Sequence, residues 1–183
     1  EEGRKEINTI ISQANIDGFY YKPRIDLSLL LSLTPKNVVV TTACVASRLF
    51  KGDDWEEAFF KPVYEHFGDN LYLEVQANNH PTQIEHNKKI LDLSHRYNVK
   101  IIHANDSHYI KPEDSKYRAL FLKAKGINYG DEDSFILDYP DYDTILARYR
   151  EQGVLSEEEA IEALDNTLVF DKSTGIFLDR EFK

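Results

Sequence analysis

Along most of this chain, apolar positions either recur at helical spacing or form short uninterrupted runs. The runs are too short for helices and are rich in β-branched or apolar residues, which predicts three buried strands, over residues 38–42, 71–76 and 99–104. Between and around these strands, apolar residues recur at the intervals of a helical face. The helices predicted from these intervals cover residues 4–15, 27–33, 52–66, 80–97 and 112–125.

Strand and helix therefore alternate at the spacing of βαβ units, which predicts parallel strands with right-handed crossovers. After Gly130 the pattern changes to two successive helices, near residues 141–152 and 156–171, with no strand between them. We expect an α/β domain over residues 1–130 and a helical tail over residues 131–183. Three strands are few for a closed barrel, so the sheet is either open or part of a barrel whose first strands are missing.

Composition narrows the class of protein further. The 183 residues are 42% hydrophobic and 12% aromatic, which is enough for a folded core, and the net charge of −10 disfavours nonspecific duplex binding by the whole surface. The single cysteine, Cys44, rules out an internal disulfide framework and fits a reduced, cytoplasmic setting. No apolar run suits a bilayer and no signal peptide is visible. Because Met is absent, we expect that the chain begins inside a longer protein.

Polar side chains follow all three predicted strands, at the edge where α/β folds build their sites. The first strand leads into residues 41–44, the second carries Glu74 and Gln76, and the third leads to Asp106 and His108. Asp and His two residues apart in an extended segment point to the same side, and both are ligands for zinc or manganese. The pair alone is also what a helix cap beside a turn would show. Cys44 alone is more often an inert core residue.

Four segments in order carry a family resemblance: GFYYKPRID at residues 18–26, TTACVA at 41–46, LYLEVQ at 71–76, and NDSHY at 105–109 followed by Glu113-Asp114. Together they resemble the PHP domain of the bacterial or phage-borne DNA polymerase III alpha subunit. The resemblance covers most of residues 4–126 and continues more weakly into the tail. It implies a distorted (β/α) barrel of which this chain is the carboxyl-terminal portion, at the amino-terminal end of a cytoplasmic replicative polymerase that works with DNA and other replisome subunits.

The resemblance also implies a metal site. In that family, where the site is intact, a cluster of zinc or manganese ions supports phosphodiester hydrolysis. Carried over residue by residue, Cys44 matches a late cysteine ligand, and Asp106 and His108 match the final Asp-x-His pair. No residue of this chain matches a polymerase catalytic or other cofactor-binding residue, because the acidic palm motif is absent.

The sequence departs from the family pattern in its early ligands. It contains no His-x-His element, and Ser47 stands where the family commonly has Gly in its Cys-Leu-Ala-Gly turn. We therefore expect these three residues to be residual ligands, with no metal bound to this chain alone, and we expect neither DNA synthesis nor phosphoesterase activity from it. A truncated barrel would leave a sheet edge exposed, through which a homodimer could form.

Two other classes of function stay open. One is a free-standing PHP-family phosphoesterase that acts on small phosphorylated substrates. The helical tail and the GFYYKPR segment of residues 18–24 argue against it. The other is a metal-free interaction module. The flanking sequence would separate the polymerase from the free-standing enzyme, and metal analysis of the intact protein would test for a degenerate site.

A few residues invite two interpretations each. Lys22 and Arg24, beside Tyr20 and Tyr21, suit contact with nucleic acid. In an acidic chain we prefer tyrosines packed into the domain and an Arg24 paired with a nearby acid. His103 is expected to be a hydrogen-bonded core residue. The remaining histidines near the second long helix miss the spacing of a metal clasp and are expected at the surface; they are His80, His86 and His95.

Overall fold

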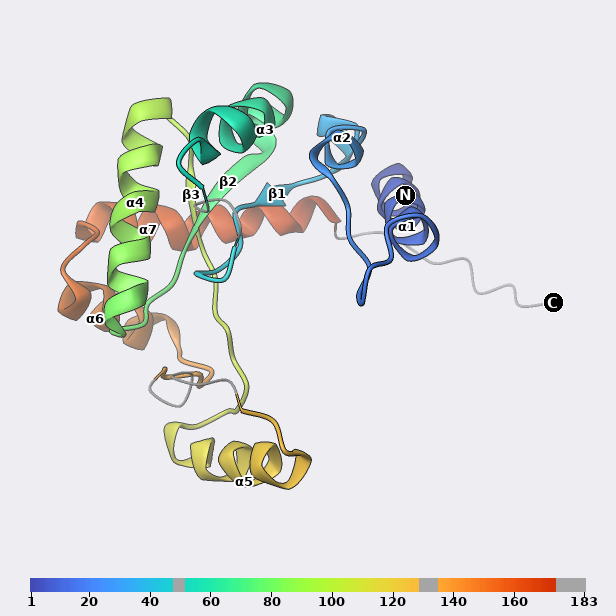
Figure 1. Cartoon of the computed structure of the whole chain (residues 1–183). Coiled ribbons are helices and arrows are strands. Elements are labelled where there is room, and N and C mark those ends of the chain that lie inside the picture. Colours follow the sequence, from blue (N-terminus) through green and yellow to red (C-terminus); the bar gives the residue numbers. More distant parts are fainter. Residues whose placement is uncertain (48–51, 129–134, 174–183) are drawn as a thin grey trace. The chain divides into compact units, whose positions relative to one another are not determined.

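The computed structural model describes residues 1–47, 52–128 and 135–173 (Figure 1). Helices and a small parallel sheet make up the chain, as the sequence predicts. The acidic run at residues 130–133 lies outside the described residues. The helices are α1 (Glu2–Ile16), α2 (Leu27–Leu30), α3 (Lys61–Phe67), α4 (Pro81–Tyr97), α5 (Ser115–Lys125), α6 (Tyr142–Gln152) and α7 (Glu157–Asp165).

Three parallel strands form an open sheet in the order β1-β2-β3, namely Val40–Thr41, Leu71–Val75 and Ile101–His103. Parallel pairing is confirmed in both ladders. The first strand is shorter than expected because the 3₁₀ turn at Pro35–Asn37 holds the chain before it, and only two residues reach the ladder. The strand residues of β2 and β3 are almost all buried, which explains their uninterrupted apolar pattern.

By packing, the described chain falls into two compact units, and the boundary runs through β2. The first unit holds α1, α2, β1, α3 and the start of β2. The second holds the end of β2, then α4, β3, α5, α6 and α7, together with the short segment of residues 43–46 around Cys44. This division groups residues by contact, so the sequence boundary near residue 130 stays a prediction.

Within the first unit, the predicted helix of residues 52–66 begins late and has a wide turn. A π-helical stretch at Glu56–Phe60 precedes α3. Pro62 explains this turn, because proline has no N–H to donate to the carbonyl four residues back and its ring crowds that carbonyl. Phe60, Val63 and Phe67 nevertheless point into the core.

Within the second unit, α4 and α7 show how local sequence fixes the ends of helices. His80 caps α4, and Asn98 ends it in a left-handed conformation with φ of 53°. At α7 Ser156 and Glu159 form a capping box, since each side chain accepts from the other residue's backbone N–H. The helix ends at Asp165 and a 3₁₀ stretch, Asn166–Ser173, follows, so the regular helix is shorter than predicted.

Two core-facing helices of the second unit, α6 and α7, pack against each other and carry residues that matter below. α7 packs on β3 through its buried residues Ala160, Ala163 and Leu164. α6 buries Tyr149 and Gln152 along with two apolar residues. None of the described helices has the length and low polarity that a membrane crossing requires.

Candidate functional site

The chain that leaves β3, residues 104–110, carries the predicted Asp-x-His pair; we call it the exit segment. Ala104 still donates to the Val75 carbonyl at 3.0 Å, so the start of this segment is fixed by the sheet. His108 Nε2 and Asp106 Oδ1 lie 3.1 Å apart. Their side chains are 41% and 52% exposed. As predicted, the two side chains meet on one side of the segment, and solvent reaches both.

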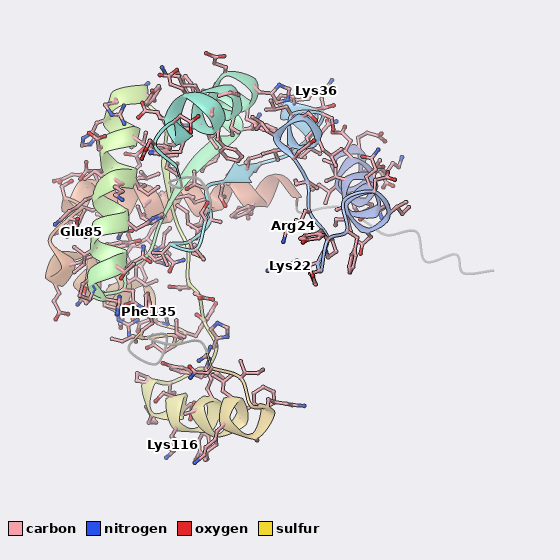
Figure 2. All side chains as sticks on the ribbon, viewed as in Figure 1. Lys22, Arg24, Lys36, Glu85, Lys116 and Phe135 are labelled. Atoms are coloured by element: carbon pink, nitrogen blue, oxygen red, sulfur yellow. The ribbon has the colours of Figure 1, made fainter. Side chains whose placement is uncertain are left out.

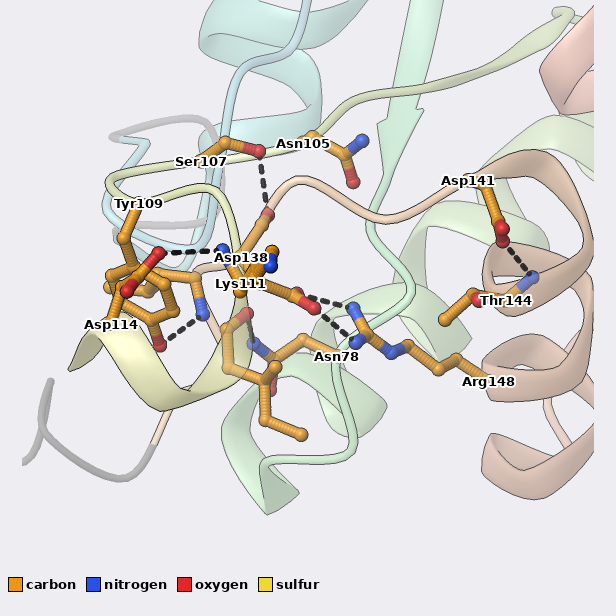
Figure 3. A network of polar contacts seen from close by, with 12 residues as sticks. Asn78, Asn105, Ser107, Tyr109, Lys111, Asp114, Asp138, Asp141, Thr144 and Arg148 are labelled. Atoms are coloured by element: carbon orange, nitrogen blue, oxygen red, sulfur yellow. Dashed lines mark hydrogen bonds and ion pairs between the residues drawn. The ribbon is translucent and has the colours of Figure 1, made fainter.

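A second stretch, residues 135–139, lies along the exit segment and holds it; we call it the docking arm (Figure 3). The backbone N–H of His108 donates to the Leu137 carbonyl at 2.8 Å, and Tyr139 N–H donates to the Ile110 carbonyl at 3.2 Å. The Tyr109 hydroxyl accepts from Leu137 N–H at 3.0 Å. The exit segment is therefore held by backbone hydrogen bonds outside any regular strand.

The docking arm is itself anchored by an ion pair. Arg148 of α6 donates both terminal nitrogens to the two carboxylate oxygens of Asp138, each at 2.7 Å (Figure 3). The Asp138 side chain is 5% exposed and that of Arg148 is 16% exposed. Hydrogen bonding to Asp138 raises the pKa of Arg148. The Asp138 carbonyl also accepts from Ser107 Oγ at 2.7 Å, so one residue links α6 to the exit segment.

A buried cluster of side-chain amides joins α4 and α6 to the backbone at the end of β2; we call it the amide cluster, and it consists of Gln83, Asn87 and Gln152. Asn87 Nδ2 donates to the Gln76 carbonyl at 2.9 Å and to Gln152 Oε1 at 2.8 Å. Gln83 Nε2 donates to Asn87 Oδ1 at 2.8 Å. Gln152 Nε2 donates to the Asn78 carbonyl at 2.8 Å. These amides satisfy backbone groups that leave the sheet without strand partners.

His103, the last residue of β3, lies immediately before the exit segment and makes two further polar contacts. Its Nδ1 lies 2.7 Å from the Tyr149 hydroxyl and its Nε2 lies 3.1 Å from Asn105 Oδ1. Burial lowers the pKa of His103 to about 4 and, with the nearby Glu74 carboxylate, raises that of Tyr149. A neutral imidazole fits both contacts, with Nε2–H donating and Nδ1 accepting. His103 is thus the hydrogen-bonded core residue that the sequence predicts.

Sequence comparison decides the relationship. No family model matches the chain. The DNA polymerase III subunit alpha of Aquifex aeolicus is 36% identical over 68% of this chain, and that of Borreliella burgdorferi is 28% identical over 92% of it. A DNA-directed DNA polymerase of Bacillus phage SPbeta is 30% identical over 68% of it. This chain belongs to the family of the DNA polymerase III alpha subunits, as the resemblance predicts. It spans 11% to 15% of the length of these relatives.

The ligands carried over from the alpha-subunit resemblance are only partly brought together. Asp106 and His108 are in contact. Cys44 lies in the turn after β1, half-buried, next to Ala43, which has a φ of 58°. Within the described ranges, no group of three or more His, Cys, Asp or Glu side chains is arranged to hold a metal ion. The described residues therefore offer a two-donor pair, and a complete metal site would need further ligands.

Two sequence interpretations of this alpha-subunit relative are wrong. His86 is buried in α4 at 7% exposure, where we expected a surface residue; burial lowers its pKa to about 4. Tyr20 and Tyr21 are 64% and 84% exposed, so they do not pack the domain. Arg24 lies over the Tyr20 ring at 5.3 Å and, in the part of the chain that the structure describes, has no ion pair with an acid. For the other histidines, His95 is exposed as expected and His80 caps α4.

Sequence reasoning about the alpha-subunit resemblance missed the docking arm, the Arg148–Asp138 pair and the amide cluster. One signal for the cluster was present. Gln83 and Asn87 lie four residues apart on the face of α4 that also buries Ile90, so two amides stand at positions of a helical stripe that usually are apolar. Asp138 and Arg148 are too far apart in the sequence for a local pairing rule, so the sequence does not predict their ion pair.

Proposed function

We propose that this chain is a segment of a DNA polymerase III alpha subunit, corresponding to the later part of its PHP domain. The relationship to alpha subunits over 68% to 92% of the chain supports the polymerase. The parallel strands and the ordered motifs of residues 18–26, 41–46, 71–76 and 105–109 support the PHP assignment. The parent protein would carry out template-directed DNA synthesis in the cytoplasm, with DNA and the other replisome subunits as its partners.

We further propose that this segment serves the parent as a frame that presents Asp106 and His108. The observation that carries this proposal is their exposed contact at 3.1 Å on a segment fixed by the docking arm. Arg148 and Asp138 would keep that arm in place. In the complete polymerase, residues outside this chain would supply the remaining ligands, with Cys44 as a third donor from this chain. A zinc or manganese ion bound there would supply Lewis-acid activation for phosphodiester hydrolysis.

The chain alone is proposed to bind no metal and to catalyse neither synthesis nor hydrolysis. Metal analysis tests this on two proteins, the 183-residue chain and the complete polymerase that contains it. We expect stoichiometric zinc or manganese only in the complete polymerase, and its loss on Asp106→Ala. His95→Ala is the matched control, because His95 is also an exposed histidine-carboxylate partner, with Glu159. Metal retained after Asp106→Ala would contradict the ligand assignment.

Primer extension tests the polymerase assignment separately from the metal. The complete polymerase should extend a primer on a DNA template. Arg148→Ala should lower the yield of active polymerase by loosening the docking arm, whereas Arg150→Ala, which breaks an exposed ion pair on the same helix, should not. A complete protein that hydrolyses small phosphate esters and does not extend primers would favour the free-standing phosphoesterase. No reported relative favours that alternative, since each of them is named as a polymerase.

A homodimer formed through the sheet edge is also a proposal. In the described sheet β1 is an edge strand and only two residues long, so any added pairing there would be short. Sedimentation of the 183-residue chain over a range of concentrations tests it, and a monomer at all concentrations would contradict it.

A further inference from the structure

The loop between α1 and α2 exposes aromatic rings beside two cations. Residues 18–24, which we call the aromatic hairpin, read Gly-Phe-Tyr-Tyr-Lys-Pro-Arg. Phe19, Tyr20 and Tyr21 are 59%, 64% and 84% exposed. Lys22 and Arg24 extend from the same side of this loop (Figure 2). In a chain with a net charge of −10, such a concentration of exposed rings and positive charge is unusual.

The backbone conformation of the aromatic hairpin keeps these rings exposed. Tyr20 N–H donates to the Lys22 carbonyl at 3.2 Å, which closes a tight turn. At its tip Tyr21 has a φ of 58°, a conformation that a tyrosine adopts at a cost. Gly18 is required at the base, because a Cβ there would lie 2.1 Å from the Arg24 carbonyl oxygen. The turn therefore holds Tyr21, the most exposed aromatic ring among the described residues, in a strained position.

The rings and the guanidinium are also arranged with respect to one another. The centroids of Tyr20 and Tyr21 lie 4.6 Å apart with an angle of 77° between the rings. The Arg24 guanidinium carbon lies 5.3 Å from the Tyr20 centroid, within cation–π distance. Tyr21 is 84% exposed, and the Arg24 guanidinium lies on the neighbouring Tyr20 ring. Aromatic faces beside guanidinium groups are the surfaces on which unpaired bases stack, while cations hold the phosphates.

A groove beside the hairpin provides room for a strand. It encloses about 550 Å³ and is lined in part by Arg24, Ile25 and Gln13. Asp26 also lines it, but its carboxylate already accepts from Leu29 N–H and Ser28 Oγ, both at 2.8 Å. These hydrogen bonds, that from Leu29 first, lower the pKa of Asp26. Asp17 is the other acid of the groove. Because carboxylates repel phosphates, we expect the phosphates of a bound strand to lie beside Lys22 and Arg24.

From these contacts we propose that the aromatic hairpin binds single-stranded DNA, with bases stacked on Tyr20 and Tyr21 and phosphates held by Lys22 and Arg24. The stacking site rests on the geometry of residues 18–24 alone, whereas the choice of DNA rests on the proposed polymerase function. Two exposed rings suit one or two bases, and aromatic stacking accepts any base. The site therefore contributes sequence-independent contact with an unpaired strand.

The test is fluorescence anisotropy of a dye-labelled single-stranded oligo(dT) with the 183-residue chain and its variants. Tyr20→Ala/Tyr21→Ala should weaken binding about fivefold or more, the loss expected from removing base stacking. Tyr20→Phe/Tyr21→Phe keeps the ring faces and should restore binding. Tyr139→Ala is the matched control, since Tyr139 is 71% exposed at a place outside the hairpin and should leave binding unchanged. Circular dichroism shows that each variant is folded.

Each other outcome overturns the proposal. If oligo(dT) does not bind, the hairpin faces another class of partner, such as a protein. If unlabelled duplex competes as well as single strand does, binding is to phosphates and no base stacks. If the alanine pair and Tyr139→Ala weaken binding equally, the site lies elsewhere. None of these results touches the polymerase assignment, because primer extension and metal content test that separately.

Discussion

Within the second unit, the buried Asp138–Arg148 pair and the exit segment that it supports are in contact but differ in burial. Asp138 and Arg148 are nearly enclosed and form a bidentate ion pair. Asp106 and His108 likewise pair an acidic with a basic side chain, but both side chains are exposed and their contact is 3.1 Å long. Where charges are buried and fully paired, removing one partner is costly; where they are exposed, the contact contributes little. The comparison separates residues that hold the segment from residues that are free to bind a ligand.

The largest effect is expected from the amide cluster. Asn87→Leu removes the partner of Gln83 Nε2, of Gln152 Oε1 and of one Gln76 carbonyl bond, all in the core. Because buried polar groups without partners cost about 1–3 kcal/mol each, the free energy of unfolding should fall by about 3–5 kcal/mol. Urea unfolding of the 183-residue chain measures it.

Asn15→Leu is the matched control for that substitution. Asn15 is an exposed helical asparagine in α1, whose side chain donates to the Ile11 carbonyl of its own helix. Its replacement should change the free energy of unfolding by less than about 0.5 kcal/mol. If Asn87→Leu were as stable as the parent chain, apolar packing would replace the cluster, and the frame would not depend on its amides.

The next largest effect should follow from the ion pair of the docking arm. Arg148→Ala leaves the Asp138 carboxylate enclosed without its cation, so the free energy of unfolding should fall by about 2–4 kcal/mol. Arg150→Ala provides the comparison on the same helix, because Arg150 pairs with Glu157 in solvent and its loss should have little effect. Equal losses for the two variants would show that the docking arm is not anchored by Arg148.

A pH effect should distinguish buried from exposed histidines. Burial lowers the pKa of His103 from 6.5 to about 4. Between these values the unfolded chain binds a proton that the folded chain does not, so stability is full above about pH 6.5 and falls as pH drops towards 4. His103→Gln should remove up to about 2 kcal/mol of that pH-dependent loss, although it lowers stability at neutral pH by disturbing Tyr149.

Urea unfolding of the parent chain and of the His103→Gln variant, at several pH values between 4 and 7, gives the slope of stability against pH for each. His95→Gln serves as the control, because the His95 side chain is 63% exposed and, among the described residues, bonds to Glu159 alone. It should leave the slope as it is in the parent chain. The same slope in the His103→Gln variant would mean that other groups, such as the buried His86, cause the loss.

These contrasts also show what the sequence could and could not predict. The order of the strands and helices follows from local signals, such as the apolar run of residues 71–76 and the capping box at Ser156. Several ends do not, since β1 is shorter than predicted and α7 ends at Asp165. The contact between Asp106 and His108 follows from the alternation of side chains in an extended segment. The Arg148–Asp138 pair does not follow, because it depends on where α6 packs, which is a property of the whole unit. The prediction that Tyr20 and Tyr21 pack into the domain was wrong. It rested on the acidic composition of the chain, whereas the turn that begins at Gly18 exposes both rings.

The smallest stability effect is expected at the exit segment, and it is the sharpest test of the comparison. Asp106→Ala removes the exposed contact with His108, so the free energy of unfolding should change by less than about 1 kcal/mol in urea. Backbone hydrogen bonds to Leu137 should keep the segment in place. A loss as large as that of Arg148→Ala would place Asp106 among the residues that hold the fold. A small loss of stability, together with a loss of metal from the complete polymerase, would instead place it among the residues that bind. A residue that the fold does not need can be replaced with little change in the free energy of unfolding, even though its ligand is lost.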